Sequence, residues 1–401
     1  MGRAFGARVL FVTQLDPSRK FGSLEECIEA LATHSKARGG LLVPVFCGLV
    51  SADLAERLSG CDAPFEVQLD FQTWSWHLAK RLLRLVDYYS INVVDFSFYP
   101  PLSPYVTLLR VLRPKVRLVY TDHRSRLPEL PRSKGMRHCL RRVAYHQYNR
   151  IFAISDFTRH ALRYSAGLRV FRCQLFVNTT RFHADSTARE KVRARLGAES
   201  VFVALVVAHL ISWKGVDIAL RAIAAASDSA QLWIAGNGPE LERLRALAGT
   251  LGLGARAWFF GEQMDVSPYL RGADCLICPS LWGEAMGFVN LEAMACGLPV
   301  IASRIGGIPE FVEHETTGLL VDAGSVEQTA AALCRLMDSP QLCSSLGRNG
   351  MERVRARYSR EVCLERYLKN YDVVCGISDS RIDCKDDRYG RDRHIAGAAD
   401  T

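Results

Sequence analysis

The sequence predicts an α/β protein of two facing domains, each with a parallel sheet that helices cover on both faces. Three observations lead to this fold class. The chain has 401 residues, enough for two domains of ordinary size. Its hydrophobic fraction of 49% and charged fraction of 23% are those of a globular protein. Short, continuously apolar runs alternate with helical stretches, which is typical of parallel strands buried on both faces.

The first half of the chain alternates predicted strands with predicted helices. The stretch 23–36 carries Leu24, Cys27, Ile28 and Leu31 at the spacing of one helix face, so we expect a helix there. Short apolar runs that indicate buried strands lie at 8–13, 41–46, 93–98, 116–121 and 151–154.

The second half repeats this architecture without repeating the sequence. Expected strands cover 201–208, 232–235, 257–260, 275–278, 300–302 and 318–321, with helices near 216–226, 239–251, 288–295 and 326–337. The seam falls around 178–195. We expect an N-terminal domain (1–185), a C-terminal domain (186–357), a helix (358–377) that packs back on the N-terminal domain, and a tail (378–401). The tail has almost no large apolar residues, which predicts disorder.

Positive charge is concentrated in the first half. Residues 1–185 hold 27 Lys and Arg against 15 Asp and Glu, a net +12, whereas the rest of the chain has a net −3. The densest basic segment is 132–150. Such a surface could meet anionic lipid headgroups or an anionic acceptor, and a solvated helix face is the plainer alternative. No nucleic-acid motif accompanies the charge, so nucleic acid is not an expected partner.

Two further features bear on the compartment. No apolar run approaches the ~18 residues of a membrane helix, and the apolar stretch 9–12 is too short for a signal-peptide core. The thirteen cysteines form no disulfide framework, so we expect reduced thiols and a cytoplasmic protein, with peripheral association at the inner membrane face as a possibility. Cys275 and Cys278 lie in a predicted strand, where packing is a better explanation than redox or metal chemistry.

Candidate binding residues follow the predicted strands of the second half, and in open α/β sheets ligands bind outside the carboxyl ends of the strands. Lys214 stands where a strand turns toward a helix and could hold a phosphate, although an ordinary surface lysine is the alternative. The turn 235–240, with Gly236 and Gly238 before a proline, is half of a dinucleotide fingerprint. A second glycine-rich turn, 305–310, also enters a short helix.

The strongest motif is a pair of glutamates, Glu284 in a loop and Glu292 about one turn into the next helix. Gly287 lies at the start of that helix, where free backbone N–H groups can bind an anion. A diphosphate there would leave a sugar near Glu284 and a ribose diol within reach of Glu292. A solvated charge is the alternative for each glutamate.

These four motifs occur in the order and spacing of a known family. The stretch 201–358 resembles the nucleotide-binding half of the family 4 retaining glycosyltransferases, which have the GT-B fold of two facing Rossmann-like domains with a cleft between them. The resemblance implies transfer of a sugar, with retention, from a nucleotide-diphosphate-sugar substrate to a saccharide or lipid-linked acceptor, as in polysaccharide or glycoconjugate biosynthesis. It implies no cofactor. The absence of Asp-x-Asp from the sequence favours a site without a metal.

The resemblance also assigns roles to individual residues. Lys214 binds the donor diphosphate and supports catalysis, Glu284 faces the transferred sugar, and Glu292 holds the ribose hydroxyls. His123, in the sequence Thr121-Asp122-His123 after a predicted strand, resembles a histidine on the sugar or acceptor side, although it could be a plain loop residue. The remaining expected donor-site residues are Gly22, Gly238, Gly287, Phe288, Val289, Gly307 and Glu310.

The chain departs from the family pattern at three places. His209 stands five residues before the lysine, where the family usually has arginine, and we expect it to touch the diphosphate. The first loop carries Gly22 alone instead of paired glycines, and 178–182 replaces the family's linker motif. These departures leave two alternatives: a GT-B relative with other chemistry, such as a nucleotide-sugar epimerase or a phosphorylase, and an inactive donor-binding protein.

Overall fold

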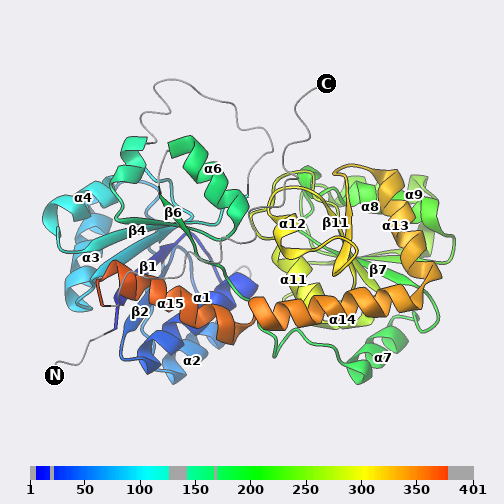
Figure 1. Cartoon of the computed structure of the whole chain (residues 1–401), viewed down its shortest axis with the longest axis horizontal. Helices are drawn as coiled ribbons and strands as arrows, with labels where there is room; N and C mark the ends of the chain where they lie inside the picture. The colour runs from blue at the N-terminus through cyan, green and yellow to red at the C-terminus, as the bar shows by residue number, and fades with distance from the viewer. Residues whose placement is uncertain (1–5, 19–21, 126–141, 167–168, 378–401) are drawn as a thin grey trace.

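The computed structural model describes residues 6–18, 22–125, 142–166 and 169–377, and shows two α/β domains lying side by side (Figure 1). Each domain is built on a six-stranded parallel sheet, which confirms the predicted fold class. The tail for which we predicted disorder (378–401) lies outside the described residues, as does the part of the basic segment from 132 to 141.

The first sheet has the strand order β2-β1-β3-β4-β5-β6, and all of its strands run parallel. Its strands are β1 (Arg8–Thr13), β2 (Leu41–Phe46), β3 (Val93–Ser97), β4 (Arg117–Asp122), β5 (Arg150–Ala153) and β6 (Val170–Arg172). The helices of this domain include α1 (Ser23–Ala37), α2 (Ala52–Gly60), α3 (Trp76–Tyr88), α4 (Pro104–Leu112) and α6 (Asp156–Ala166).

The second sheet has the order β12-β11-β10-β7-β8-β9. Its strands are β7 (Val203–Val207), β8 (Gln231–Ala235), β9 (Ala257–Gly261), β10 (Cys275–Cys278), β11 (Val300–Ser303) and β12 (Gly318–Val321). The helices are α7 (Ser186–Arg195), α8 (Val216–Ala226), α9 (Leu241–Thr250), α10 (Ser267–Gly272), α11 (Phe288–Ala295), α12 (Ile308–Phe311), α13 (Val326–Asp338), α14 (Pro340–Arg357) and α15 (Arg360–Val374), with short 3-10 turns at Ser212–Lys214 and Gly254–Arg256.

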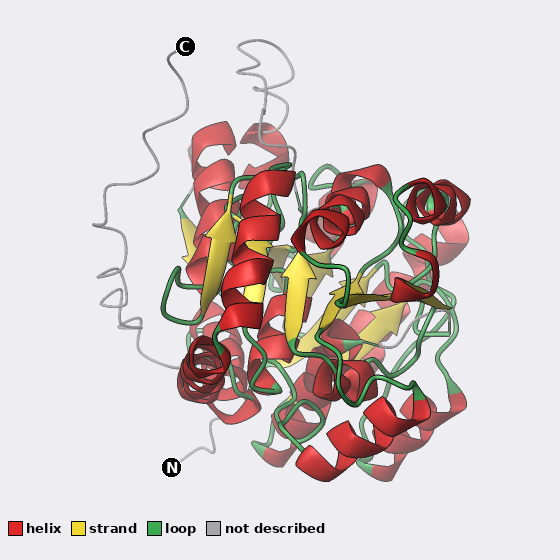
Figure 2. Cartoon of the chain, turned by 90° about the vertical axis from the view of Figure 1, so that its right-hand side faces the viewer, coloured by secondary structure: helices red, strands yellow, loops and turns green. Residues whose placement is uncertain are grey.

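The strands form where the sequence is continuously apolar, because helices cover both faces of each sheet. Every residue of β3 and of β10 is buried, and Figure 2 shows helices on both sides of the strands. One cluster of buried side chains includes Ile28 of α1 and Leu291 of α11, so an apolar core is continuous between the two domains.

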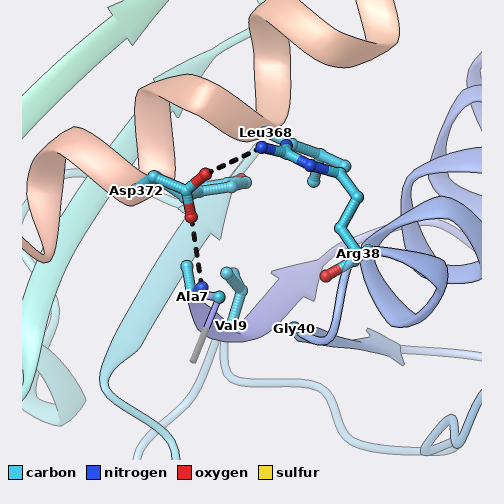
Figure 3. A pocket seen from close by; sticks show the side chains of 9 residues that line it. Ala7, Val9, Arg38, Gly40, Leu368 and Asp372 are labelled. Carbon is cyan, nitrogen blue, oxygen red and sulfur yellow. Dashed lines mark hydrogen bonds and ion pairs between the residues drawn. The ribbon is translucent and has the colours of Figure 1, made fainter. Parts of the chain in front are cut away.

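The C-terminal helices tie the two domains together. The α14 helix packs against α11 in the second domain, and α15 then lies on the first domain (Figure 1). The Tyr371 hydroxyl of α15 donates a hydrogen bond of 2.6 Å to the buried carboxylate of Asp95 in β3. Asp372 of α15 accepts a hydrogen bond from the Ala7 N–H (3.2 Å) and forms an ion pair with Arg38 (3.2 Å), and these contacts border a small pocket of about 30 Å³ (Figure 3).

Three other findings on the described chain concern thiols, metals and membranes. Every described cysteine is free, and burial raises the pKa of both Cys275 and Cys278 in β10. Over the described ranges, no three His, Cys, Asp or Glu side chains are grouped as metal ligands. None of the helices in that same part of the chain is long and apolar enough to cross a membrane.

Candidate active site

The site lies where the strand order of the second sheet reverses. The chain leaves β7 toward β8 on one side, whereas β10 and β11 continue on the other side, so the ends of β7 and β10 mark the switch point at which open α/β sheets bind their ligands. The loops after β7 and β10 touch at their base. Gly215 has a φ of 65°, and a Cβ there would lie 2.1 Å from the Pro279 carbonyl oxygen, so only glycine fits. The Leu281 N–H also donates to the Trp213 carbonyl (2.8 Å).

This close approach brings Lys214 and Glu284 together. The Lys214 ammonium forms an ion pair with the Glu284 carboxylate, to which the Ser280 hydroxyl also donates (2.8 Å). Glu284 is buried, and a buried carboxylate needs partners that compensate its charge. Lys214 and Ser280 are two such partners. Lys214, for which the resemblance implies a diphosphate contact, and Glu284, for which it implies a sugar contact, are therefore neighbours at the switch point of the second sheet.

The helix that follows has a glycine start, as the motif requires. Gly287 is the N-cap of α11 with a φ of 69°, and Phe288 and Val289 form its first turn. A Cβ at Gly287 would lie 2.8 Å from the amide nitrogen of the buried Asn290, so a larger residue would clash. The first N–H groups of a helix have no intrahelical partner and favour an anion. Glu292 lies one turn further and is also buried.

Residues of the first domain contact both glutamates, and sequence analysis did not anticipate them. The Ser23 hydroxyl, at the start of α1, donates to the Glu292 carboxylate. The Ser125 hydroxyl, after β4, donates to the other oxygen of the Glu284 carboxylate (3.3 Å) and accepts from the Ala285 N–H (3.1 Å). The cleft between the domains is thus closed over the Glu-x7-Glu motif.

His123 follows β4 in the first domain and is buried. Its ring stacks on Phe98, with centroids 4.6 Å apart, and neither ring nitrogen has a hydrogen-bond partner among the residues that the structure describes. Burial lowers the pKa of His123 to about 4, although the charge of Asp122 opposes this shift. The imidazole is therefore neutral at physiological pH and can both donate and accept one hydrogen bond.

The glycine-rich turns brace the site through their backbone. The Gly307 N–H donates to the Glu284 carbonyl (2.8 Å), and a Cβ at Gly307 would lie 2.5 Å from the Ala285 carbonyl oxygen. Gly238 packs in the same way against Leu210, because a Cβ at Gly238 would lie 2.4 Å from the Leu210 carbonyl oxygen. His209 is exposed at the carboxyl end of β7. Gly22 is the N-cap of α1, directly before Ser23.

Glu310 has contacts that the sequence did not indicate. Its carboxylate accepts hydrogen bonds from the N–H groups of Asp156 (2.7 Å) and Phe157 (2.6 Å), at the start of α6, and pairs with Arg172 (3.3 Å). Burial raises the pKa of Glu310, and Arg172 and the two N–H groups oppose that shift. Glu310 thus joins the second domain to the first, and its part in donor binding stays a prediction.

Comparisons with known proteins identify the family to which the chain belongs. The family described as "Glycosyltransferase Family 4" matches residues 25–178, and the one described as "Glycosyl transferases group 1" matches 188–353. The GDP-mannose-dependent alpha-(1-6)-phosphatidylinositol monomannoside mannosyltransferase of Mycobacterium tuberculosis is 30% identical over 381 residues, 88% of this chain and 94% of that relative. The lipopolysaccharide core biosynthesis glycosyltransferase LpsD of Rhizobium meliloti is 34% identical over 171 residues, 43% of this chain and 49% of the relative.

Solved structures share the whole fold. The crystal structure of Anabaena Alr3699/HepE in complex with UDP has a TM-score of 0.77 at 19% identity, and the match covers 91% of this chain and 100% of that one. Fold and comparisons together define a nucleotide-sugar-dependent GT-B glycosyltransferase. The chain belongs to glycosyltransferase family 4, as the sequence motifs predicted.

Proposed function

We propose that this glycosyltransferase works with retention and without a metal, and that its acceptor is a saccharide or a lipid-linked saccharide. The observation that carries the proposal is the ion pair between Lys214 and Glu284 at the switch point of the second sheet. Helix α11 follows in the chain, with Gly287 as its N-cap and Glu292 in its second turn. One cation, one helix start and two carboxylates are the groups that a nucleotide-diphosphate-sugar needs for its phosphates, its ribose and its sugar.

The main chemical task is to stabilise the negative charge that develops on the diphosphate leaving group. The Lys214 ammonium and the first N–H groups of α11 are positioned to do this. The Lys214 ammonium is held by the Glu284 carboxylate at this position. A bound diphosphate would share this cation, so that part of the site is organised before the donor arrives.

His123 supports the sugar from the opposite domain. Because the imidazole is neutral and its ring nitrogens have no partner among the described residues, it can hydrogen-bond a sugar hydroxyl without an ionic competitor. Retention requires either a front-face displacement or a covalent glycosyl-enzyme, and the position of Glu284 beside the sugar is compatible with both.

A lipid-linked acceptor is supported by the relatives and by one surface. Two of the relatives are named as a phosphatidylinositol monomannoside mannosyltransferase and a lipopolysaccharide core biosynthesis glycosyltransferase. Helices α3 and α4 contact each other at the end of the first domain remote from the second (Figure 1). Large apolar side chains are exposed on these two helices and in the segments directly before them, at Trp74, Trp76, Tyr88, Leu102, Val111 and Leu112. Lys80 and Arg84 are exposed on α3, and this aromatic and basic mixture suits an anionic membrane surface.

Vesicle co-sedimentation tests the membrane part of the proposal. Binding to anionic vesicles should fall as salt rises, because screening weakens the attraction, and the double change Lys80→Ala with Arg84→Ala should reduce it. Arg195→Ala, an exposed arginine on α7 of the second domain, is the matched control. Failure to bind anionic vesicles at low salt would remove the membrane association and leave the transferase chemistry untouched.

A thermal-shift screen against a panel of nucleotide-sugars tests the donor, because a ligand stabilises the fold by mass action. Turnover assays with the stabilising donor then separate the alternatives. An epimerase changes the donor when no acceptor is present, a phosphorylase needs inorganic phosphate, and an inactive donor-binding protein gives a thermal shift with no turnover over a broad acceptor panel. Transfer that requires an acceptor supports the proposal.

A further inference from the structure

Ser23 makes a contact that the proposed chemistry does not use. It is the first residue of α1 in the first domain, it is buried, and its hydroxyl donates a hydrogen bond to the Glu292 carboxylate of the second domain. These two residues are 269 positions apart in the chain. The contact therefore exists only when the two domains are closed over the cleft.

The helix start does not need this hydroxyl. Gly22 is the N-cap of α1, its N–H is bonded by the Glu25 carboxylate (2.9 Å), and its carbonyl accepts from the Glu26 N–H (3.1 Å). Both contacts form without the Ser23 hydroxyl. The Ser23 hydroxyl is bonded to Glu292 of the other domain, so this side chain acts across the cleft and does not cap its own helix.

We propose that the Ser23 hydroxyl occupies the place on the Glu292 carboxylate that a ribose hydroxyl of the donor takes, so that the donor must displace it. This inference rests on the proposed function, in which Glu292 holds the ribose. A serine hydroxyl and a ribose hydroxyl are the same chemical group, and each donates one hydrogen bond to a carboxylate oxygen. Binding of the donor therefore exchanges one hydroxyl for another at Glu292.

A second contact has the same form. The Ser125 hydroxyl, also from the first domain, bonds the Glu284 carboxylate and the Ala285 N–H, a donor and acceptor pair suited to a sugar hydroxyl. Each glutamate of the motif thus holds a serine hydroxyl of the opposite domain. This pairing joins the two domains with bonds that resemble those of the ligand, and each bond opposes ligand binding.

Glycine has no side chain to reach Glu292, and the methyl group of alanine cannot donate a hydrogen bond. The variants Ser23→Gly and Ser23→Ala therefore each remove the competing hydroxyl.

The test is calorimetric binding of GDP and UDP, and of their 2′,3′-dideoxy counterparts, to the full chain and its variants. Ser23→Gly and Ser23→Ala should bind the ribonucleotide about tenfold more tightly, the factor that one net hydrogen bond to a carboxylate provides. The dideoxy nucleotide has no diol to exchange with Ser23, so its affinity should be unchanged. Thr33→Ala, which removes another α1 hydroxyl that donates only to the Ala30 carbonyl of its own helix (3.1 Å), is the matched control.

The outcomes separate the inference from the proposed function. Unchanged or weaker ribonucleotide binding by both Ser23 variants overturns the inference, as does equal tightening for the dideoxy nucleotide. Ser23→Ala guards against a glycine variant that loses the helix start. If neither GDP nor UDP binds the wild-type chain, the proposed nucleotide site fails first, and the inference falls with it.

Discussion

The buried carboxyl of Asp95 gives a quantitative prediction about pH and stability. Asp95 lies in β3, fully buried, where it accepts hydrogen bonds from Thr121 (2.7 Å) and from Tyr371 of α15 (2.6 Å). Burial raises the pKa of Asp95 from 3.8 to about 6, although these hydrogen bonds oppose the shift. The carboxyl group therefore binds a proton more tightly in the folded chain than in the unfolded chain.

The sign and size of the effect follow from this pKa. Below pH 3.8 the group is protonated in both states and its stabilising contribution is complete. As pH rises toward 6 the unfolded chain ionises first, so the folded state loses stability, and above the folded pKa the loss is constant. A shift of about two pKa units corresponds to roughly 2–3 kcal/mol.

The perturbation is Asp95→Asn, which removes the titration. Relative to this variant, the wild type should lose roughly 5–10 °C of thermal midpoint between pH 4 and pH 7, given about 2–4 °C per kcal/mol for a domain of this size. Tyr371→Phe removes a hydrogen bond that favours the ionised form, so the pKa should rise further and the loss should extend to higher pH. Midpoints that run parallel for wild type and Asp95→Asn across this range would refute the reasoning.

Four predictions concern the cleft. Glu292→Gln should weaken nucleoside-diphosphate binding about tenfold or more in calorimetry, because the ribose loses hydrogen bonds to a charged group, and unchanged affinity in a folded variant would exclude the ribose role. Lys214→Ala should lower kcat about a hundredfold or more, because the leaving group loses its cation, and near-normal kcat would assign the diphosphate to α11 alone. His209→Arg should tighten nucleoside-diphosphate binding several-fold by adding a permanent charge, whereas no change would make His209 a structural residue. Glu310→Ala should lower the thermal midpoint by several degrees because two N–H groups of α6 lose their acceptor, and an equal effect from the exposed Glu313→Ala would contradict this.

Much of the fold could be predicted from the sequence because its strands are continuously apolar. The predicted helix 216–226 has the bounds of α8 (Val216–Ala226), since its apolar residues keep helical spacing between a glycine and a serine. The strand β6 was not anticipated, because the three residues Val170–Arg172 are too few to show a period. Helix α3 was missed as well, although its buried residues Ala79, Leu82, Leu85 and Val86 lie at helical spacing.

The site was predictable as far as it follows the strands of one sheet. Lys214 and Glu284 come after neighbouring parallel strands, so the order of the motifs was enough to bring them together. The contacts of Ser23, Ser125 and Glu310 could not be derived in this way. Each of them joins residues of different domains, and no local pattern in a sequence records how two domains face each other.

The central claim is that the cleft transfers a sugar with retention, and the anomeric proton signal tests it most directly. The donor that stabilises the protein is incubated with acceptor and followed by proton NMR, with a sample that lacks acceptor beside it. The account predicts release of nucleoside diphosphate only when acceptor is present, and a product whose anomeric coupling matches that of the donor. An inverted product, or a donor that changes in the sample without acceptor, would contradict it.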